Sequence, residues 1–432
     1  MQQTNKLYLR PIKIGILFSV ATFILYLWGP YPFPSVNRLI MAIFLVFCNV
    51  AMYYGFKHGA LGVRGYYEPK KVVNVSSFIN TLFVIALLIA IPKFVIYTRF
   101  YDNTVGQTLL SLGTFLSGGA DQLYANRQEI QNAIGIWRYI NYGVVLFGAF
   151  HWMYIPLSMY FWRKLSLLVK AGTLFIWAMY LLQYVCTGTN VGIFDFFIML
   201  FVINIIRNYK KNMGRRKKRN WRNIILFTIL IFVVLYAFDF VMGSRIGDKT
   251  TSVPIGNGAV YLDKQTPLWV LTPSALHPLL SYLTRYVALP YHALAMSFEV
   301  PFETTFGIGH SWFLLDNVPF FSADLWDRTY MMKMEQMFEY SHWSSWHTAY
   351  LWFANDFSHF GVPIILFFLF RVFGKSWRAY LANGNVLSLL FFMLFVKMII
   401  YISANNQVFQ PSDTMFAFWM LLIAQRKYMI KE

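Results

Sequence analysis

Three arginines are the residues best suited to hold an anionic ligand. Arg127 lies in a polar stretch, Arg245 follows the end of an apolar one, and Arg285 lies inside the apolar segment 276–298. Arginine binds phosphate oxygens in a planar, bidentate way that lysine does not match. For Arg127 and Arg285, an anionic ligand and a structural ion pair both fit the sequence. Arg245 also fits an interfacial anchor.

His347 is the side chain best suited to accept a proton. Histidine has an ordinary pKa of about 6.5, which suits a general base at neutral pH. Glu299 and Glu303 are alternative bases. His342 and His347 lack a third partner for a typical metal site, and the chain has no phosphate-binding loop or dinucleotide motif. We therefore expect neither a metal nor a cofactor.

Membrane-spanning helices must position these residues. Hydrophobic residues make up 58% of the 432-residue chain and charged residues only 13%, which is too little polar surface for a soluble protein. We predict about ten spans, each a helix because lipid offers backbone groups no partners. Their bounds are near residues 12–29, 36–56, 78–98, 138–160, 166–186, 190–206, 224–243, 348–371, 386–404 and 411–425. This pattern predicts an all-α polytopic membrane protein with one integral membrane domain over residues 1–432.

The basic residues predict the orientation. Most of the 37 Lys and Arg residues lie at the N-terminus, in every second connection and in the C-terminal tail. Basic residues gather on the cytoplasmic side of membrane proteins, so we expect both termini in the cytoplasm. The net charge of +19 is then explained by anionic membrane lipids and not by nucleic acid.

Five ionisable residues fall in the external half of their spans or at its edge. Such residues are costly in a bilayer and usually line a polar cavity or pair with one another. They are Lys93, Asp195, Asp239, Asp356 and Lys397. Five on one side indicate a water-accessible hollow that opens outward. Internal salt bridges or snorkelling are the alternative for each residue.

The longest external connection covers residues 244–346. A loop of about 100 residues is usually folded or functional. Its segment 276–299 is apolar, but Arg285 and Pro290 lie within it. We interpret it as a re-entrant or interfacial helix. An eleventh span is the alternative, although it would move the basic C-terminal connections outside.

Short motifs cluster in and after this loop. Ser345-Trp-His-Thr-Ala-Tyr is followed by Asn355-Asp-Phe-Ser-His-Phe-Gly361 and Gly374, and Phe306-Gly-Ile-Gly309 follows an aromatic and Pro-containing stretch, Tyr282–Leu294. These stretches, with the topology, resemble the Wzy-type polymerases of bacterial O-antigen and capsular polysaccharide. Thr348, Asp356, Phe357 and Gly361 match the family pattern, and Ser358 replaces its first glycine. Arg127 matches an arginine of the early external loop, whereas Thr187-Gly-Thr-Asn190 lacks the arginine of the family's Gly-Ser-Arg.

The resemblance implies a glycosyltransferase of the GT-C-like membrane architecture. It would act on the periplasmic face of the bacterial inner membrane, transferring a growing glycan from undecaprenyl pyrophosphate to a new lipid-linked repeat unit, without metal or nucleotide sugar. A chain-length regulator is a further partner to consider. Arg127, Arg245, Arg285 and Lys397 would bind the pyrophosphate, and His347 would be the base. Asp356 would be structural, pairing with Lys397 or a loop arginine. Trp312, Trp326, Trp343 and Trp346 would stack on sugar rings or anchor the protein in the membrane.

Two other functions fit the same sequence. A related ligase, which passes finished glycan to a lipid or protein acceptor, would share the donor site. A lipid-linked oligosaccharide flippase or other transporter would instead show polar groups in both halves of the membrane and paired interrupted helices.

Overall fold

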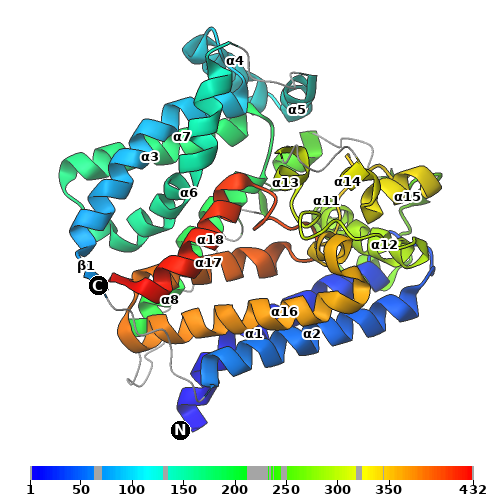
Figure 1. The fold of residues 1–432 in the computed structure, drawn as a ribbon. Helices are drawn as coiled ribbons and strands as arrows, with labels where there is room; N and C mark the ends of the chain where they lie inside the picture. The colour runs from blue at the N-terminus through cyan, green and yellow to red at the C-terminus, as the bar shows by residue number, and fades with distance from the viewer. Residues whose placement is uncertain are drawn as a thin grey trace. The chain divides into compact units, whose positions relative to one another are not determined.

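A computed structural model describes residues 2–62, 71–129, 135–211, 232, 235–236, 238–244, 251–317, 324–343 and 345–430. The described chain is predominantly helical, with very little sheet (Figure 1). Its few strands form two two-stranded pieces, β1 with β4 and β2 with β3. In the second piece, antiparallel strands pair Val253 with Val260. The prediction of an all-α protein is confirmed.

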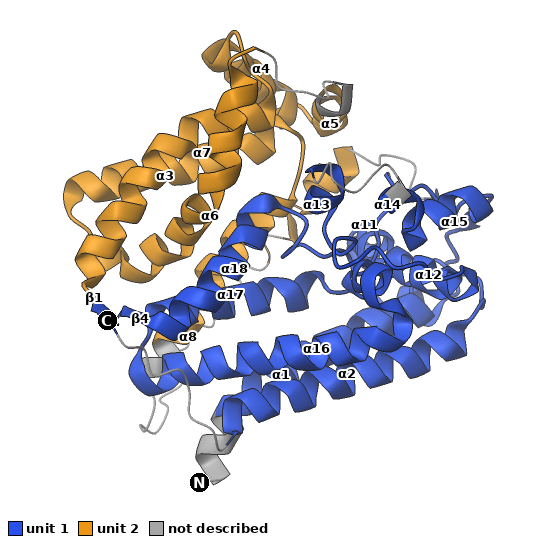
Figure 2. Ribbon diagram, viewed as in Figure 1, with its two compact units in different colours: residues 1–72, 248–432 blue, residues 73–247 orange. Residues whose placement is uncertain are grey.

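Two compact units make up the chain, residues 1–72 with 248–432, and residues 73–247 (Figure 2). The sequence was interpreted as a single membrane domain, and the structure divides it further. The first unit contains α1 (Gln2–Trp28), α2 (Arg38–Leu61), β2 (Ser252–Pro254), β3 (Ala259–Tyr261), α10 (Pro267–Leu271), η3 (Ser274–Leu276), α11 (His277–Leu283), η4 (Thr284–Ala288), α12 (Leu289–Met296), η5 (Ser297–Glu299), α13 (Trp312–Asn317), α14 (Asp324–Asp327), α15 (Tyr330–Phe338), α16 (Ala349–Asn383), α17 (Val386–Tyr401), α18 (Ser412–Lys427) and β4 (Tyr428–Ile430). Strand β1 (Lys71–Val73) lies at the boundary. The second unit contains α3 (Val75–Thr98), α4 (Thr104–Leu116), α5 (Ala120–Glu129), α6 (Trp137–Phe161), η1 (Trp162–Lys164), α7 (Leu167–Cys186) and α8 (Val191–Lys211).

Six described helical segments are long and apolar enough to cross a membrane. They lie at Tyr8–Trp28, Arg38–Leu61, Val75–Thr98, Trp137–Lys164, Leu167–Cys186 and Ala349–Asn383. These segments indicate a multi-pass membrane protein. The predicted spans at 190–206, 386–404 and 411–425 form helices α8, α17 and α18. Most of the predicted span 224–243 lies outside the described residues.

Helices α2 and α16 pack closely because glycines remove the side chains between them. A Cβ added to Gly55 would lie 2.2 Å from the Phe367 carbonyl oxygen, and one added to Gly59 would lie 2.0 Å from that of Arg371. From the other side, a Cβ on Gly374 would lie 2.3 Å from the Phe56 carbonyl oxygen. Small residues four apart let helices in membranes approach at backbone distance. This contact anchors α16, which carries part of the candidate site.

Helix α16 is interrupted at Ser358, which has φ 55° and ψ 172°. Only glycine adopts such angles readily. Ser358 is the residue that replaces a glycine of the resembling motif. The break separates the long C-terminal part of α16 from a first part, Ala349–Asp356, in which every residue is buried. The short buried part presents Asn355 and Asp356 to the loop before α13.

The segment predicted as a re-entrant or interfacial helix is helical from α11 to η5. It contains a π-helical turn, η4, at Thr284–Ala288, which carries Arg285. Its C-terminal part packs on α1, where the Tyr291 hydroxyl lies 3.0 Å from Thr22 Oγ1 and the Tyr291 ring 5.7 Å from that of Phe23. π-turns interrupt the regular hydrogen-bond ladder and often occur at functional sites. The segment is not among the six candidate spans.

Candidate functional site

A tight turn at residues 304–311 forms the floor of the candidate site. Phe306 and Gly307 both have positive φ, 56° and 85°. The Phe306 N–H donates to Thr304 Oγ1, whereas the backbone N–H groups of Gly307, Gly309 and His310 point inward. Such a turn creates an anion-binding concavity. Gly309 completes the turn, because an added Cβ would lie 2.1 Å from Thr305 Oγ1 and 2.7 Å from Asn355 Cβ. The stretch Phe306-Gly-Ile-Gly309 therefore folds as part of this turn.

The Asp356 carboxylate fills this concavity. Its Oδ1 accepts from Thr305 Oγ1 at 2.5 Å and from the backbone N–H groups of Gly307 and Gly309 at 3.0 and 2.8 Å. Its Oδ2 accepts from the His310 backbone N–H at 3.0 Å and lies 2.9 Å from His310 Nδ1. We expected Asp356 to pair with Lys397 or a loop arginine. The structure pairs it with His310, because the folded turn brings five donors onto the carboxylate.

This pairing determines the tautomer of neutral His310. An ionised carboxylate only accepts hydrogen bonds, so Nδ1 must carry the proton and Nε2 is left with a free lone pair. The His310 side chain is 13% exposed, and its Nε2 has no hydrogen-bond partner among the described residues. A histidine oriented by a carboxylate through one nitrogen is the usual arrangement of a general base. His310 is thus equipped to take a proton through Nε2.

Two neighbouring segments hold the turn. The Asn355 side chain donates to the Gly309 carbonyl oxygen at 2.9 Å and accepts from the Tyr330 backbone N–H at 2.9 Å. From the loop before α18, Asn406 Nδ2 donates to the His310 carbonyl oxygen at 3.1 Å. The Ser311 hydroxyl donates to the Phe409 carbonyl oxygen at 2.6 Å. The dyad of His310 and Asp356 is therefore fixed by both segments before any ligand binds.

A cluster of aromatic rings begins two residues after His310. The Trp312 ring centroid lies 4.8 Å from that of Trp326 and 4.7 Å from that of Trp343. His342 lies nearly parallel to Trp312, at 6.2 Å. We call these four side chains the tryptophan cluster. Three of the four tryptophans that the sequence proposed for sugar stacking thus meet in one place.

The fourth tryptophan, Trp346, packs elsewhere in the same unit. Its ring lies 5.0 Å from that of Tyr286, the residue after Arg285. Arg285 is half-buried, and its Nη1 donates to the Ser252 carbonyl oxygen at 3.3 Å. Burial lowers the pKa of Arg285, and the nearby Tyr31 opposes this. The structure thus places Arg285 and the stretch containing His347 on adjoining segments.

His347 is placed differently from the expected base. It is 2% exposed, and neither ring nitrogen has a hydrogen-bond partner among the described residues. Burial lowers its pKa to about 3; the charge of His342 adds to this, and the His342 backbone opposes it. A base works best when its pKa is near the working pH. The ring is therefore neutral and a weak base at pH 7, so the geometry favours His310 for this role.

The remaining predicted site residues are only partly placed. Lys397 lies buried in α17, and of the other intramembrane charges Lys93, Asp195 and Asp356 are also buried. Asp239 is half-buried, and its Oδ1 lacks a partner among the described residues. Arg245 lies outside the described residues, and so does the side chain of Arg127, whose backbone belongs to α5. The proposed convergence of Arg127, Arg245, Arg285 and Lys397 stays a prediction.

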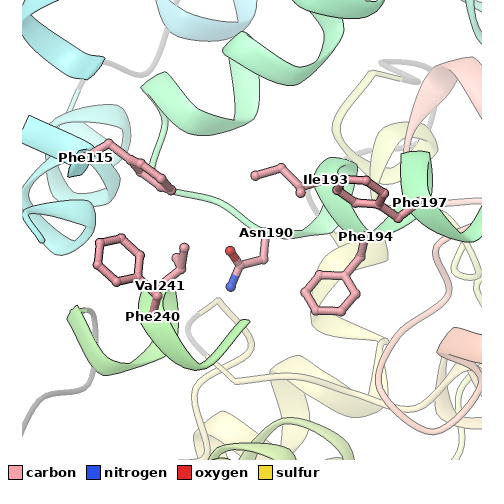
Figure 3. A pocket seen from close by; sticks show the side chains of 7 residues that line it. All are labelled: Phe115, Asn190, Ile193, Phe194, Phe197, Phe240 and Val241. Carbon is pink, nitrogen blue, oxygen red and sulfur yellow. The ribbon is translucent and has the colours of Figure 1, made fainter. Parts of the chain in front are cut away.

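The second unit contains an apolar pocket of about 110 Å³ (Figure 3). Asn190, the residue before α8, lies there among aromatic and aliphatic side chains. The others are Phe115, Ile193, Phe194, Phe197, Phe240 and Val241. Asn190 is 8% exposed, and its Nδ2 has no hydrogen-bond partner in the described part of the chain. A single donor holds water poorly, since buried waters make two to four hydrogen bonds, about three on average. The pocket therefore suits an apolar group with one acceptor.

Comparisons with protein-family models, curated proteins and solved structures give no match for this chain.

Sequence reasoning missed His310 as a functional residue. It follows Gly309 in a short glycine-containing turn, and no fixed spacing links it to Asp356. The available signal was the costly charge of Asp356 in a predicted span, which required a polar partner somewhere in the fold. Only the turn at residues 304–311 shows that His310 is this partner.

Proposed function

We propose that this protein is a metal-independent glycosyltransferase that polymerises undecaprenyl-pyrophosphate-linked repeat units into O-antigen or capsular polysaccharide. It would have about ten transmembrane helices in a GT-C-like arrangement. Both termini would be cytoplasmic and the site would face the periplasm. The observation that supports this most is the dyad of His310 and Asp356 beside the tryptophan cluster: a base that activates a hydroxyl, next to rings that suit sugars.

In the proposed reaction His310 Nε2 removes the proton from an acceptor hydroxyl. The hydroxyl oxygen attacks the anomeric carbon of the donor glycan, and the bond from that carbon to the pyrophosphate oxygen breaks. Undecaprenyl pyrophosphate leaves with the bonding electrons, and the proton stays on His310 until solvent takes it. Asp356 stabilises the imidazolium that forms, as the carboxylate of a catalytic triad does.

Negative charge grows on the departing pyrophosphate. Preorganised cationic groups stabilise such charge best where water is excluded. Arg285 is our first candidate, because it is half-buried and lies beside the Tyr286 and Trp346 contact. Arg127, Arg245 and Lys397 stay candidates on the strength of the sequence. Membrane lipids and a chain-length regulator complete the proposed partners.

A strain that lacks this protein tests the proposal. Its glycans are separated on a gel beside those of complemented cells. A ladder that collapses to one repeat unit, still transferred to its normal acceptor, is the expected result. Full-length glycan left on the carrier lipid would instead indicate a ligase, and repeat units trapped on the cytoplasmic face a flippase.

The role of His310 is tested in the complemented strain. His310→Gln should reduce the ladder to one or two repeats while the protein accumulates normally, because glutamine fills the space without serving as a base. His58→Gln is the matched control, since His58 is an exposed residue at the end of α2. A wild-type ladder from His310→Gln would contradict the proposed base. His347→Gln, tested in parallel, shows whether the buried histidine contributes.

A further inference from the structure

The tryptophan cluster is held together by one carboxylate. Asp316 Oδ2 accepts from Trp312 Nε1 at 2.5 Å, and its Oδ1 accepts from Trp326 Nε1 at 3.1 Å. Each carboxylate oxygen can accept two hydrogen bonds, so Asp316 keeps acceptor capacity for a ligand. The desolvating rings around it raise its pKa, which the indole N–H groups and His342 oppose. The indole nitrogens of Trp312 and Trp326 are thus engaged, and the ring faces define the surface.

The cluster remains open to ligands at its edge. The Trp343 side chain is 58% exposed although its ring packs on Trp312. His342 is paired with Glu335, whose pKa is lowered by this pairing although burial opposes it. The surface therefore combines exposed aromatic faces with two carboxylates, Asp316 and Glu335.

Covalent and packing links place this surface beside the dyad. Trp312 follows His310 by two residues, and its backbone N–H donates to Gln410 Oε1 at 2.9 Å. The Trp312 ring also lies 6.2 Å from that of Trp352, one turn before Asp356 on α16. The buried Trp352 Nε1 has no hydrogen-bond partner among the described residues. The cluster therefore begins two residues after His310 in the chain and contacts the helix that carries Asp356.

We propose that the tryptophan cluster is the acceptor subsite and that it binds an uncharged pyranose ring. This inference rests on the proposed function. The axial C–H groups of a sugar carry partial positive charge and complement the negative face of an indole ring. Asp316 and Glu335 accept hydrogen bonds from sugar hydroxyls. Glu335 is paired with His342, so the repulsion of a sugar carboxylate comes mainly from Asp316. The nearby Lys333 does not cancel this preference, because Glu303 already pairs with it at 2.9 Å.

Saturation-transfer NMR on the full chain in lipid nanodiscs tests this subsite without turnover. The probes are maltotriose, N-acetylchitotriose and trigalacturonate. We expect saturation of the C–H protons of at least one uncharged probe and none of trigalacturonate. Trp343→Leu should weaken the binding about tenfold or more, judged from the value of aromatic stacking to nucleobases. Trp343→Phe should restore part of it, since it keeps a ring face.

A membrane anchor at Trp343 is distinguished by the same variants. Leucine partitions into the membrane as phenylalanine does, so equal behaviour of Trp343→Leu and wild type would overturn the subsite. Trp419→Leu is the matched control, because Trp419 is 49% exposed and lies on α18, outside the cluster. Strong binding of trigalacturonate would also overturn the subsite, and so would the absence of binding by all three probes. Sugar binding with unchanged ladders in His310→Gln would refute the polymerase mechanism and leave the subsite standing.

Discussion

The substitution Asp356→Asn tests the dyad most directly, because it alters charge and leaves the shape of the side chain unchanged. The amide oxygen can take the place of Oδ1 and keep the three bonds from Thr305, Gly307 and Gly309. The amide nitrogen then takes the place of Oδ2 and faces two groups of His310, its backbone N–H and its ring Nδ1. A nitrogen that donates cannot accept from either.

Two effects follow from this geometry. The His310 backbone N–H loses a charged acceptor, which costs about 1.5–3 kcal/mol of stability. The His310 ring can still accept a hydrogen bond from the new amide through Nδ1, but its proton must then move to Nε2. This removes the free lone pair that the proposed reaction uses. The same tautomer reversal lowers the turnover of a serine protease about 10⁴-fold, so we expect a loss of about 10³–10⁴-fold here.

The assay measures glycan chain extension by the purified variant after it is reconstituted into membranes. Thermal unfolding in detergent is the second measurement. Asp327→Asn is the control, since Asp327 is an exposed aspartate on α14. We expect Asp356→Asn to lose nearly all glycan extension and to show only a modest decrease in the free energy of unfolding. Extension at the wild-type rate would refute the role of Asp356 in orienting His310. Loss of folded protein would show that the carboxylate is mainly the anchor of the turn.

Four further predictions follow from single positions. Gly59→Ala should lower the free energy of unfolding by about 1–3 kcal/mol, because its Cβ would lie 2.0 Å from a backbone oxygen of α16. In the same thermal unfolding experiment, Gly143→Ala should be neutral or stabilising, because no atom lies within 4 Å of its added Cβ. Ser358→Gly should raise the unfolding temperature, since it relieves about 1 kcal/mol or more of backbone strain; a lower temperature would contradict the strain. Asn190→Leu should raise the free energy of unfolding by about 1–3 kcal/mol, because it removes a buried amide nitrogen that has no partner among the described residues. Loss of glycan extension would instead reveal a ligand in the pocket around Asn190. Arg285→Ala should abolish extension at normal protein abundance, as judged by glycan gel and immunoblot; low abundance would make Arg285 structural.

Local patterns in the sequence were sufficient to predict most of the long apolar helices. Continuous apolar stretches predicted α3, α6 and α7 within a few residues, because a helix satisfies its backbone groups within one segment in lipid. For three other helices one end was misplaced, since α1 begins at Gln2, α2 ends at Leu61 and α16 ends at Asn383. The same patterns singled out Asp356 and Lys397, because a charge in an apolar stretch is conspicuous wherever its partner lies. Arg285 was noticed for the same reason, and the π-turn around it was not.

The roles of individual residues depended on contacts between distant segments. His347 met every sequence criterion for a base, yet the fold buries it and lowers its pKa to about 3. His310 was not singled out from the sequence, yet the turn at residues 304–311 brings it 2.9 Å from Asp356. Protonation behaviour depends on burial and on nearby charges, and neither can be read from a single stretch of sequence.

Hydropathy and charge along the chain are enough to indicate a helical membrane protein with costly polar groups inside its apolar helices, because both are properties of consecutive residues. Which of these polar groups meet depends on the fold. Backbone amides of the turn enclose Asp356, Asp316 joins two tryptophans from separate helices, and glycines bring α2 and α16 to backbone distance. Each of these depends on positive φ angles, close backbone approach or hydrogen bonds between separate segments, and hydropathy and charge along the chain reveal none of them.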